Sequence, residues 1–426
     1  MKPGDRVRIT TTDGSYDGIL MPPEASTVIL KLDTGYNIGI PTRRIKEKKV
    51  LKEYKEKKSK KSSIKQKKGL PHITLLHTGG TIASKVDYGT GGVIARFEPE
   101  ELLQLFPEIR DYANITSRLV SNMWSEDMRF AHYNVLAREV EKEIKKGVQG
   151  IIITHGTDTL HYTSAALAFA LENCPVPVLL VGAQRSSDRP SSDAAMNVIC
   201  AARFIAETDF CGVALAMHEH VSDDTVLILP ACKSRKMHAS RRDAFQAINA
   251  LPLARIHYHG KISLLSAHPV PSGPFALQLF KEKLKVGILR GHTNMYASQF
   301  LAFKDFDGLI LEGTGIAGNV PINHIDKYTG EHKKIATAIK QLIKNGTLVA
   351  AATQTIHGRV HMDVYQTGRD MQKLGILGNK LDMTAETAFI KLAWLLSNFK
   401  KDEVASLYEQ NLRGEISERQ VYDSYP

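Results

Sequence analysis

The chain of 426 residues is too long for one ordinary hydrophobic core, so two or three domains are expected. Hydrophobic residues make up 43 % of the chain and charged residues 24 %, proportions that argue against a disordered chain and against a membrane protein. The formal net charge at pH 7 is +11, a value that by itself invites a nucleic-acid-binding interpretation.

That positive charge belongs to one short segment. Between Arg43 and Lys68 there are twelve lysines and two arginines against three glutamates, and the rest of the chain is neutral overall. A block of like charges is typical of a solvated linker, and contact with an RNA backbone is the alternative interpretation. A broad basic recognition surface is therefore not expected.

The cysteines and the N-terminus indicate a reducing compartment. Cys174, Cys200, Cys211 and Cys232 form no CxxC pair and have no histidine at zinc-finger spacing. Neither a disulfide framework nor a metal site is expected, and buried reduced thiols are the default. The N-terminus has no apolar signal region and no apolar run is long enough to span a bilayer, so the sequence predicts a cytoplasmic protein.

Residues 1–50 predict a small β-barrel of SH3-like or Sm-like type. The segments DRVRIT, SYDGILMPP, TVILKL and YNIGIPTRRI read as short strands separated by turn residues. Modules of this size serve more often in docking than in catalysis. A Lys-rich linker is expected to follow over residues 51–70.

From residue 71 onward the pattern predicts α/β structure. Apolar runs of strand length alternate with helical stretches, as in VQGIIITHGTDT followed by LHYTSAALAFALEN. This alternation is typical of a parallel, doubly wound sheet with helices on both faces. The Pro- and Gly-containing stretch AHPVPSGPFAL divides it, which predicts a first α/β domain over 71–270 and a second over 280–426.

Two strand ends carry a threonine after a glycine. The strand ITLLH runs into TGGTIAS, residues 78–84, and the strand IIIT runs into HGTDT, residues 155–159. Ligands of open α/β sheets bind at the C-terminal ends of the strands. Two hydroxyls, backbone N–H groups next to glycines and a carboxylate are the groups that acyl transfer needs. The alternative is structural, with Thr81, or Thr157 and Asp158, only capping the helices that follow.

The segments TGGTIAS and THGTDTL resemble the two signature motifs of the bacterial-type asparaginase and glutaminase family. The similarity extends over roughly Ile73 to Asn398. It implies two α/β domains of asparaginase type after the small barrel, and an enzyme that cleaves a side-chain amide with a threonine nucleophile.

The resemblance implies a role for each matching residue. Thr81 corresponds to the nucleophile, and Thr157, Asp158 and Lys236 correspond to the hydrogen-bonded triad of a second threonine, an aspartate and a lysine. A lysine held beside a carboxylate is one way to build a base near neutral pH. An exposed basic surface is the alternative for Lys236, which has arginines close to it in the chain.

The remaining expected site residues bind the substrate. Ser125 and Glu126 fall where the family holds the α-carboxylate and α-amino groups, and the loop glycines Gly80 and Gly156 free backbone N–H donors. The glycines of KVDYGTGGVIARF suit a lid, with Tyr88 as its tyrosine. No metal is implied.

The barrel, the linker and the stretch RKMHASRRDAF extend the resemblance to the archaeal enzymes that convert Glu-tRNA(Gln) to Gln-tRNA(Gln). This implies that ammonia from glutamine or asparagine passes to a partner E subunit, which binds most of the tRNA. ATP and Mg²⁺ are expected only at that partner, and this chain is expected to need no cofactor. The chain is expected to be a homodimer, and with the partner a heterotetramer.

Two other functions remain open from the sequence. A free-standing asparaginase with an accessory N-terminal domain would share every catalytic residue, and an inactive scaffold could bind RNA through the basic segment. The choice between glutamine and asparagine stays open as well. The two differ by one methylene, and a pocket distinguishes such substrates by only about 1–3 kcal/mol of binding free energy.

Overall fold

The computed structural model describes residues 1–22, 26–34, 36–54, 66–80, 82, 84–86, 93–95, 106–187, 191–268, 270–420 and 422. Thr81, Tyr88 and the middle of the Lys-rich linker lie outside the described residues. Two short strands flank Tyr88 in the sequence, β7 (Ser84–Val86) and β8 (Val93–Ala95), and they pair antiparallel.

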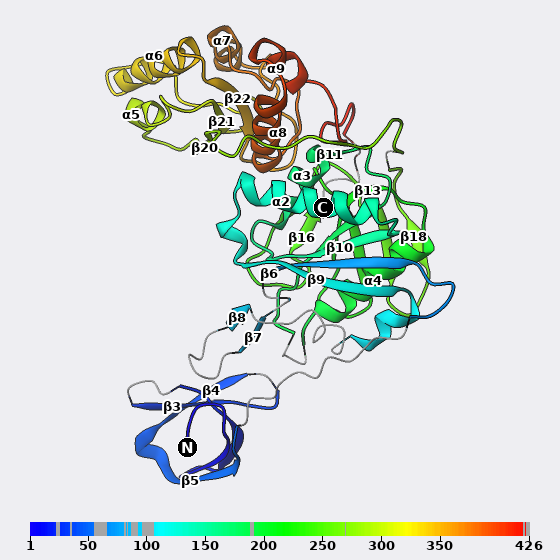
Figure 1. The fold of residues 1–426 in the computed structure, drawn as a ribbon. Helices are drawn as coiled ribbons and strands as arrows, with labels where there is room; N and C mark the ends of the chain where they lie inside the picture. The colour runs from blue at the N-terminus through cyan, green and yellow to red at the C-terminus, as the bar shows by residue number, and fades with distance from the viewer. Residues whose placement is uncertain are drawn as a thin grey trace.

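The N-terminal unit is a curled five-stranded antiparallel sheet (Figure 1). Its strands, in the order β4-β3-β2-β1-β5, are β1 (Arg6–Thr11), β2 (Ser15–Leu20), β3 (Thr27–Lys31), β4 (Asn37–Pro41) and β5 (Ile45–Lys52), with the 3-10 turn η1 (Thr42–Arg44) before β5. Alternate residues point inward, as the period of a strand requires, and make a core of Val7, Ile9, Val28, Leu30 and Ile40. This unit matches the expected small β module.

An eight-stranded sheet forms the centre of the molecule, in the order β18-β17-β14-β13-β12-β10-β6-β9. Five of its strands are parallel: β6 (His72–Gly79), β9 (Asn114–Met123), β10 (Gly150–Thr154), β12 (Pro177–Val181) and β13 (Gly212–His218). The other three form an antiparallel meander: β14 (Thr225–Pro230), β17 (Ala254–His257) and β18 (Ile262–Leu264). The sheet is therefore mixed, whereas the sequence pattern predicted only its parallel part.

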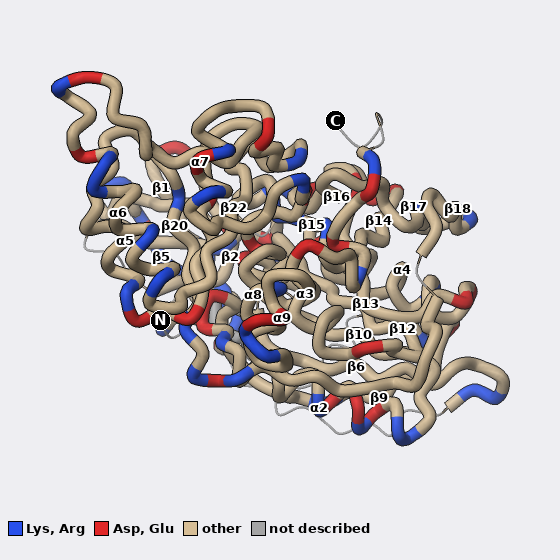
Figure 2. Tube along the Cα trace, turned by 90° about the horizontal axis from the view of Figure 1, so that it is seen from above, with Lys and Arg blue, Asp and Glu red and all other residues tan. Residues whose placement is uncertain are grey.

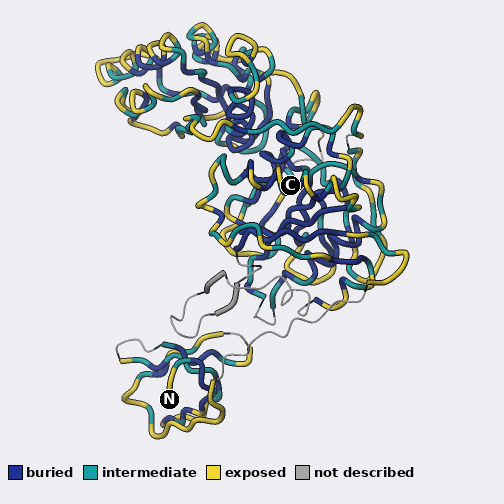
Figure 3. The backbone as a smooth tube through the Cα atoms, viewed as in Figure 1, coloured by how far each residue is buried: buried dark blue, intermediate teal, exposed yellow. Residues whose placement is uncertain are grey.

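Both faces of the parallel strands are buried. Ile151 and Ile153 of β10 point into one core with the helices α2 (Phe130–Lys145) and α3 (Leu160–Ala170), and Ile152 points into the opposite core with α4 (Ala194–Glu207). Burial on both sides explains why these strands read as continuous apolar runs. Figure 3 shows the buried residues concentrated in this sheet and its helices.

The C-terminal unit is a three-stranded parallel sheet with helices. Its strands are β20 (Val286–Arg290), β21 (Gly308–Gly313) and β22 (Leu348–Thr353), and its helices are α5 (Ala297–Leu301), α6 (Gly330–Lys344), α7 (Gln366–Leu374), α8 (Ala385–Asn398) and α9 (Lys401–Tyr408). Helix α8 packs on α3, where the rings of Phe169 and Trp394 lie 5.2 Å apart. One apolar core thus joins the two α/β units.

The remaining described elements are short. They are the 3-10 turns η3 (Pro107–Asp111) and η4 (Ser125–Asp127), the pair β11 (Leu171–Glu172) with β19 (Ala276–Leu277), and the hairpin β15 (Ser234–Lys236) with β16 (Phe245–Ala247). Among the helices described, none has the length and apolar character needed to cross a bilayer. In Figure 2 basic and acidic residues are interspersed over the fold.

A fully buried ion pair ties the C-terminal tail to α8. The ammonium of Lys391 lies 2.6 Å from a carboxylate oxygen of Glu415, and both side chains have no exposed surface. Glu415 also accepts hydrogen bonds from the backbone N–H groups of Leu412 and Arg413. Burial lowers the pKa of Lys391, while the charge of Glu415 acts to raise it.

We expect Lys391→Met to lower the free energy of unfolding by about 3–5 kcal/mol, because it leaves the Glu415 carboxylate buried without its cation. The measurement is urea-induced unfolding followed by circular dichroism. Combining it with Glu415→Leu removes the orphaned charge and should restore most of the loss. A Lys391→Met variant as stable as the wild type would contradict the pairing. A double variant less stable than both single variants would show that the loss does not come from the unpaired charge.

Candidate active site

Two neighbouring strands end at the same edge of the central sheet. Strands β6 and β10 are parallel, and His77 lies opposite Thr154. The hydroxyl of Thr78 donates to the carbonyl oxygen of Thr154 at 2.9 Å, so the strand ends are joined by a side chain as well. The segments that continue toward Thr81 and Thr157 therefore leave the sheet side by side, as the strand-end argument predicted.

Two glycines let three loops approach at backbone distance. A Cβ atom on Gly80, whose φ is +79°, would lie 2.4 Å from the backbone nitrogen of Gly156. A Cβ atom on Gly156 would lie 2.9 Å from the Cβ of Ser125. Any side chain at either glycine would push the loops apart, because real Cβ atoms do not approach other atoms this closely. Both predicted site glycines thus lie at the convergence of the loops.

Lys236 binds both residues of the second motif. Its ammonium donates to the hydroxyl oxygen of Thr157 and to a carboxylate oxygen of Asp158, each at 2.8 Å. The Lys236 side chain is only 10 % exposed, whereas that of Asp158 is 67 % exposed. Lys236 therefore points into the site and not into bulk water, which excludes the alternative of an exposed basic surface.

The lysine reaches the threonine from a hairpin. Lys236 ends β15, which pairs with β16 so that Lys236 lies opposite Phe245. Thr157 is buried against the next strand end, since a Cβ atom on Gly182 would lie 2.7 Å from the Cγ2 of Thr157. The contact that the family resemblance implied among Thr157, Asp158 and Lys236 is present, while their catalytic roles stay a prediction.

Ser125 lies at the site and Glu126 lies at its edge. Ser125 is buried on the turn η4, against Gly156, whereas Glu126 next to it is exposed. The role of Glu126 in binding the substrate's amino group stays a prediction. The sequence argument missed Thr159, whose hydroxyl donates to the carbonyl of Ser125 at 2.6 Å and so joins the second motif to η4.

Helix capping does not explain the second motif. Helix α3 begins after Thr159, which makes no side-chain capping hydrogen bond. Thr157 and Asp158 turn their oxygens toward Lys236. The polar groups of the motif are thus used for contacts between loops.

A buried histidine fixes the peptide of Gly156. The Nδ1 of His155 lies 2.7 Å from the carbonyl oxygen of Gly156, and Nε2 lies 2.9 Å from the hydroxyl of Thr163. Burial lowers the pKa of His155 to about 4, against the effect of the Gly156 carbonyl, so the ring is neutral near pH 7. Because a carbonyl only accepts, Nδ1 carries the proton and Nε2 accepts from Thr163.

A cavity of about 380 Å³ opens beside Lys236. Its lining comprises Asp158, His161, Tyr162, Arg235, Lys236, Met237, His238, Ala239 and Glu386. Glu386 belongs to α8 of the C-terminal unit and accepts a hydrogen bond from Arg235 at 2.8 Å. Burial acts to raise the pKa of Glu386, but Arg235 and His161 outweigh it and hold this pKa below its ordinary value. The cavity is of a size that can hold a small ligand.

The fold and this site define an amidohydrolase of the asparaginase and glutaminase class. Residues 72–269 match the family described as Asparaginase, N-terminal, and residues 285–406 match the Glutaminase/Asparaginase C-terminal domain. The solved L-asparaginase of Thermococcus kodakarensis superposes with a TM-score of 0.72 at 29 % identity, covering 82 % of this chain and 100 % of that chain. L-asparaginase I of Vibrio cholerae gives a TM-score of 0.69 at 26 % identity, with 82 % and 100 % covered.

The chain belongs to the family of glutamyl-tRNA(Gln) amidotransferase D subunits. It is 43 % identical to the family member of Pyrococcus furiosus, covering 97 % of this chain and 94 % of the relative, and 37 % identical to that of Methanococcus maripaludis, covering 97 % and 98 %. Residues 1–51 match the GatD N-terminal domain. The predicted family, fold class and enzyme class are confirmed, and a free-standing asparaginase is not favoured.

Proposed function

We propose that this chain is the amidohydrolase subunit of a tRNA-dependent amidotransferase. It releases ammonia from glutamine or asparagine, and a partner E subunit uses that ammonia to convert Glu-tRNA(Gln) to Gln-tRNA(Gln). The observation that carries the proposal is the Lys236 ammonium, which bridges Thr157 and Asp158 at the sheet edge where β6 ends, two positions before Thr81 in the sequence. The relatives' names supply the tRNA-dependent setting.

The reaction begins with attack by the Thr81 hydroxyl on the carboxamide carbon. Its proton passes through the Thr157 hydroxyl to the amine form of Lys236, 2.8 Å away from that oxygen. The Asp158 carboxylate then stabilises the ammonium that forms. Collapse of the tetrahedral intermediate breaks the C–N bond and expels ammonia, which takes up the proton. Water hydrolyses the Thr81 ester and releases glutamate or aspartate.

The groups around the reacting carbon bind the rest of the substrate. Asp158, whose side chain is 67 % exposed, and Ser125 with Glu126 hold the α-amino and α-carboxylate groups. Backbone N–H groups of the loops at Gly80 and Gly156 are suited to hold the developing oxyanion, because both glycines bring backbone into the site. From the family resemblance we assign to Tyr88 the role of the lid tyrosine.

The assembly is proposed from the family. The chain forms a homodimer in the cytoplasm, pairs with the E subunit and contacts Glu-tRNA(Gln) mainly through it, while ATP and Mg²⁺ act at that partner. This chain itself needs no cofactor. The Lys-rich segment serves as a tether, and its last part is anchored where Lys67 Nζ meets Asp111 at 2.8 Å. Contact of that segment with RNA is the alternative.

The test of this proposal is ammonia release from glutamine and from asparagine by the chain alone, with the E subunit, and with E plus Glu-tRNA(Gln). We expect slow release by the chain alone and an increase of about tenfold or more with E and Glu-tRNA(Gln), because closing the site around its substrate favours the reactive geometry. Uncharged tRNA(Gln) is the control. Brisk asparagine hydrolysis that does not respond to partner or tRNA would contradict the proposal and favour a free-standing asparaginase.

A further inference from the structure

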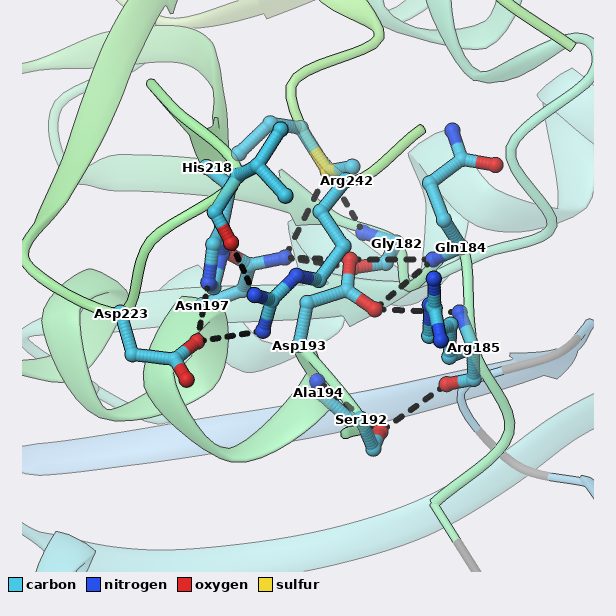
Figure 4. A network of polar contacts seen from close by, with 12 residues as sticks. Gly182, Gln184, Arg185, Ser192, Asp193, Ala194, Asn197, His218, Asp223 and Arg242 are labelled. Atoms are coloured by element: carbon cyan, nitrogen blue, oxygen red, sulfur yellow. Dashed lines mark hydrogen bonds and ion pairs between the residues drawn. The ribbon is translucent and has the colours of Figure 1, made fainter. Parts of the chain in front are cut away.

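A chain of polar side chains links Arg242, Asp223, His218, Asn197 and Asp193 (Figure 4). It begins at Arg242, in the loop that joins β15 to β16. The Arg242 side chain is 12 % exposed, and its guanidinium donates to a carboxylate oxygen of Asp223 at 2.6 Å and to the carbonyl of Val221. The loop that follows Lys236 is thereby fastened to the turn between β13 and β14.

His218, the last residue of β13, lies at the centre of this network. Its Nε2 lies 3.1 Å from the carboxylate oxygen of Asp223 that also binds Arg242, and its Nδ1 lies 2.6 Å from the side-chain oxygen of Asn197. The ring is fully buried. It therefore connects the meander side of the sheet to helix α4.

The hydrogen bonds of Asn197 determine what His218 must donate. The Asn197 amide nitrogen donates to the carbonyl of Gly182 at 3.0 Å, so its oxygen faces His218 as an acceptor. The Asp223 carboxylate also only accepts. Both ring nitrogens of His218 thus face acceptor oxygens.

The far end of the network supports the loop behind Thr157. The Asp193 carboxylate is fully buried and accepts from the backbone N–H groups of Gln184 at 3.0 Å and Arg185 at 3.0 Å. Burial raises the pKa of Asp193, while the Gln184 N–H and the His218 charge oppose that shift. With the Asn197 bond to Gly182, these contacts hold the segment on which the Thr157 methyl group packs.

We infer that His218 is a positioning residue for the reaction. Through its bond to Asn197 it holds the Gly182 segment behind Thr157, and through Asp223 and Arg242 it holds the hairpin that carries Lys236. It thereby fixes the 2.8 Å contact between the Lys236 ammonium and the Thr157 hydroxyl. Only the kinetic part of its test rests on the proposed function, because that part uses ammonia release as the readout.

The kinetic test compares His218→Gln in two backgrounds. In the otherwise wild-type chain we expect kcat for ammonia release to fall about 10–100-fold with KM changed less than about threefold, because an ångström of displacement at a catalytic group can cost about 10²-fold. In the Lys236→Met background His218→Gln should lower kcat less than about twofold, since the group that it positions is already gone. His220→Gln, at an exposed histidine two positions away, is the matched control.

Arg242→Gln serves as the second variant, because its position in the hairpin loop lies outside the apolar core and the substitution leaves that core intact. Alone, Arg242→Gln should lower kcat about as much as His218→Gln does. The variant that carries both changes should have the same kcat as His218→Gln alone. Equal losses of His218→Gln in both backgrounds, or no loss at all, would overturn the positioning role. An inactive wild-type chain would instead count against the proposed function.

A crystal structure of His218→Gln tests the geometry independently of activity. We expect the distance from Lys236 Nζ to Thr157 Oγ1 to exceed about 3.5 Å, with the hairpin loop around Arg242 displaced as well. An unchanged contact in the variant crystal would overturn the inference whatever the kinetics show.

Discussion

Replacing Thr81 with valine is expected to lower the rate of ammonia release from glutamine by roughly 10³–10⁶-fold. Valine keeps the branched shape of threonine but has no hydroxyl, so the covalent ester cannot form. The proposed binding groups at Ser125, Gly156 and Asp158 stay in place, so glutamine binding should change little. The measurement is coupled detection of ammonia at saturating glutamine, with binding followed by calorimetry.

Two controls make this result specific to the nucleophile. Thr81→Ser restores a hydroxyl and should keep at least about a hundredth of the activity, because the same bond can form from a less constrained rotamer. Thr337→Val removes a hydroxyl from the exposed side of α6 and should leave the rate unchanged. A Thr81→Val enzyme that keeps a tenth of wild-type activity would contradict the assignment.

The second large effect is expected at Lys236. Lys236→Met should reduce kcat about 10²–10⁴-fold, the usual contribution of a positioned general base. Methionine fills a similar volume but cannot take a proton through Thr157. Stability should change little, because the Asp158 carboxylate is 67 % exposed and stays solvated without its partner.

Lys236→Arg separates a base from a positive charge. Arginine keeps the cation but cannot lose a proton near neutral pH, so we expect a loss as large as that of Lys236→Met. Lys261→Met, at an exposed lysine on the same domain, is the matched control. An active Lys236→Arg enzyme would mean that charge, and not proton transfer, is what the site needs.

The location of the site could be predicted because it depends on local sequence. The strand ends near Thr78 and His155 are marked by apolar runs, since β10 and all of β6 after His72 are buried. Parallel neighbours deliver such ends to one sheet edge, which is where Gly80 and Gly156 meet. The role of Lys236 came only from the family resemblance, because 78 residues separate it from Asp158.

The parts that the sequence did not predict depend on distant contacts. The meander strands β17 and β18 are short and partly exposed, so they carry no strong apolar pattern. Strand β14 is apolar and mostly buried, but its pattern does not show that it runs antiparallel to β13. His155 and His218 look like ordinary polar residues in the sequence. Their importance comes from burial between partners such as Thr163, Asn197 and Asp223, which only the folded chain brings together.

The junction of the two α/β units was also hidden in the sequence. Lys233 follows β14 and pairs with Asp382 of the C-terminal unit at 2.7 Å, with both side chains buried. The backbone N–H of Ser417 donates to the same carboxylate at 3.0 Å. The segment that leads to Lys236 is thus tied to the C-terminal tail. In the sequence, Lys233 and Asp382 carry no sign that they pair across the two units.

The cooperation of Thr157 and Lys236 is the claim on which the mechanism depends, and a double-variant cycle tests it most directly. Measured as kcat for ammonia release, Thr157→Val combined with Lys236→Met should be no slower than the slower single variant, because hydroxyl and amine move one proton as a unit. If the losses of the single variants multiply in the double variant, the two groups act independently and the proposed proton path is wrong.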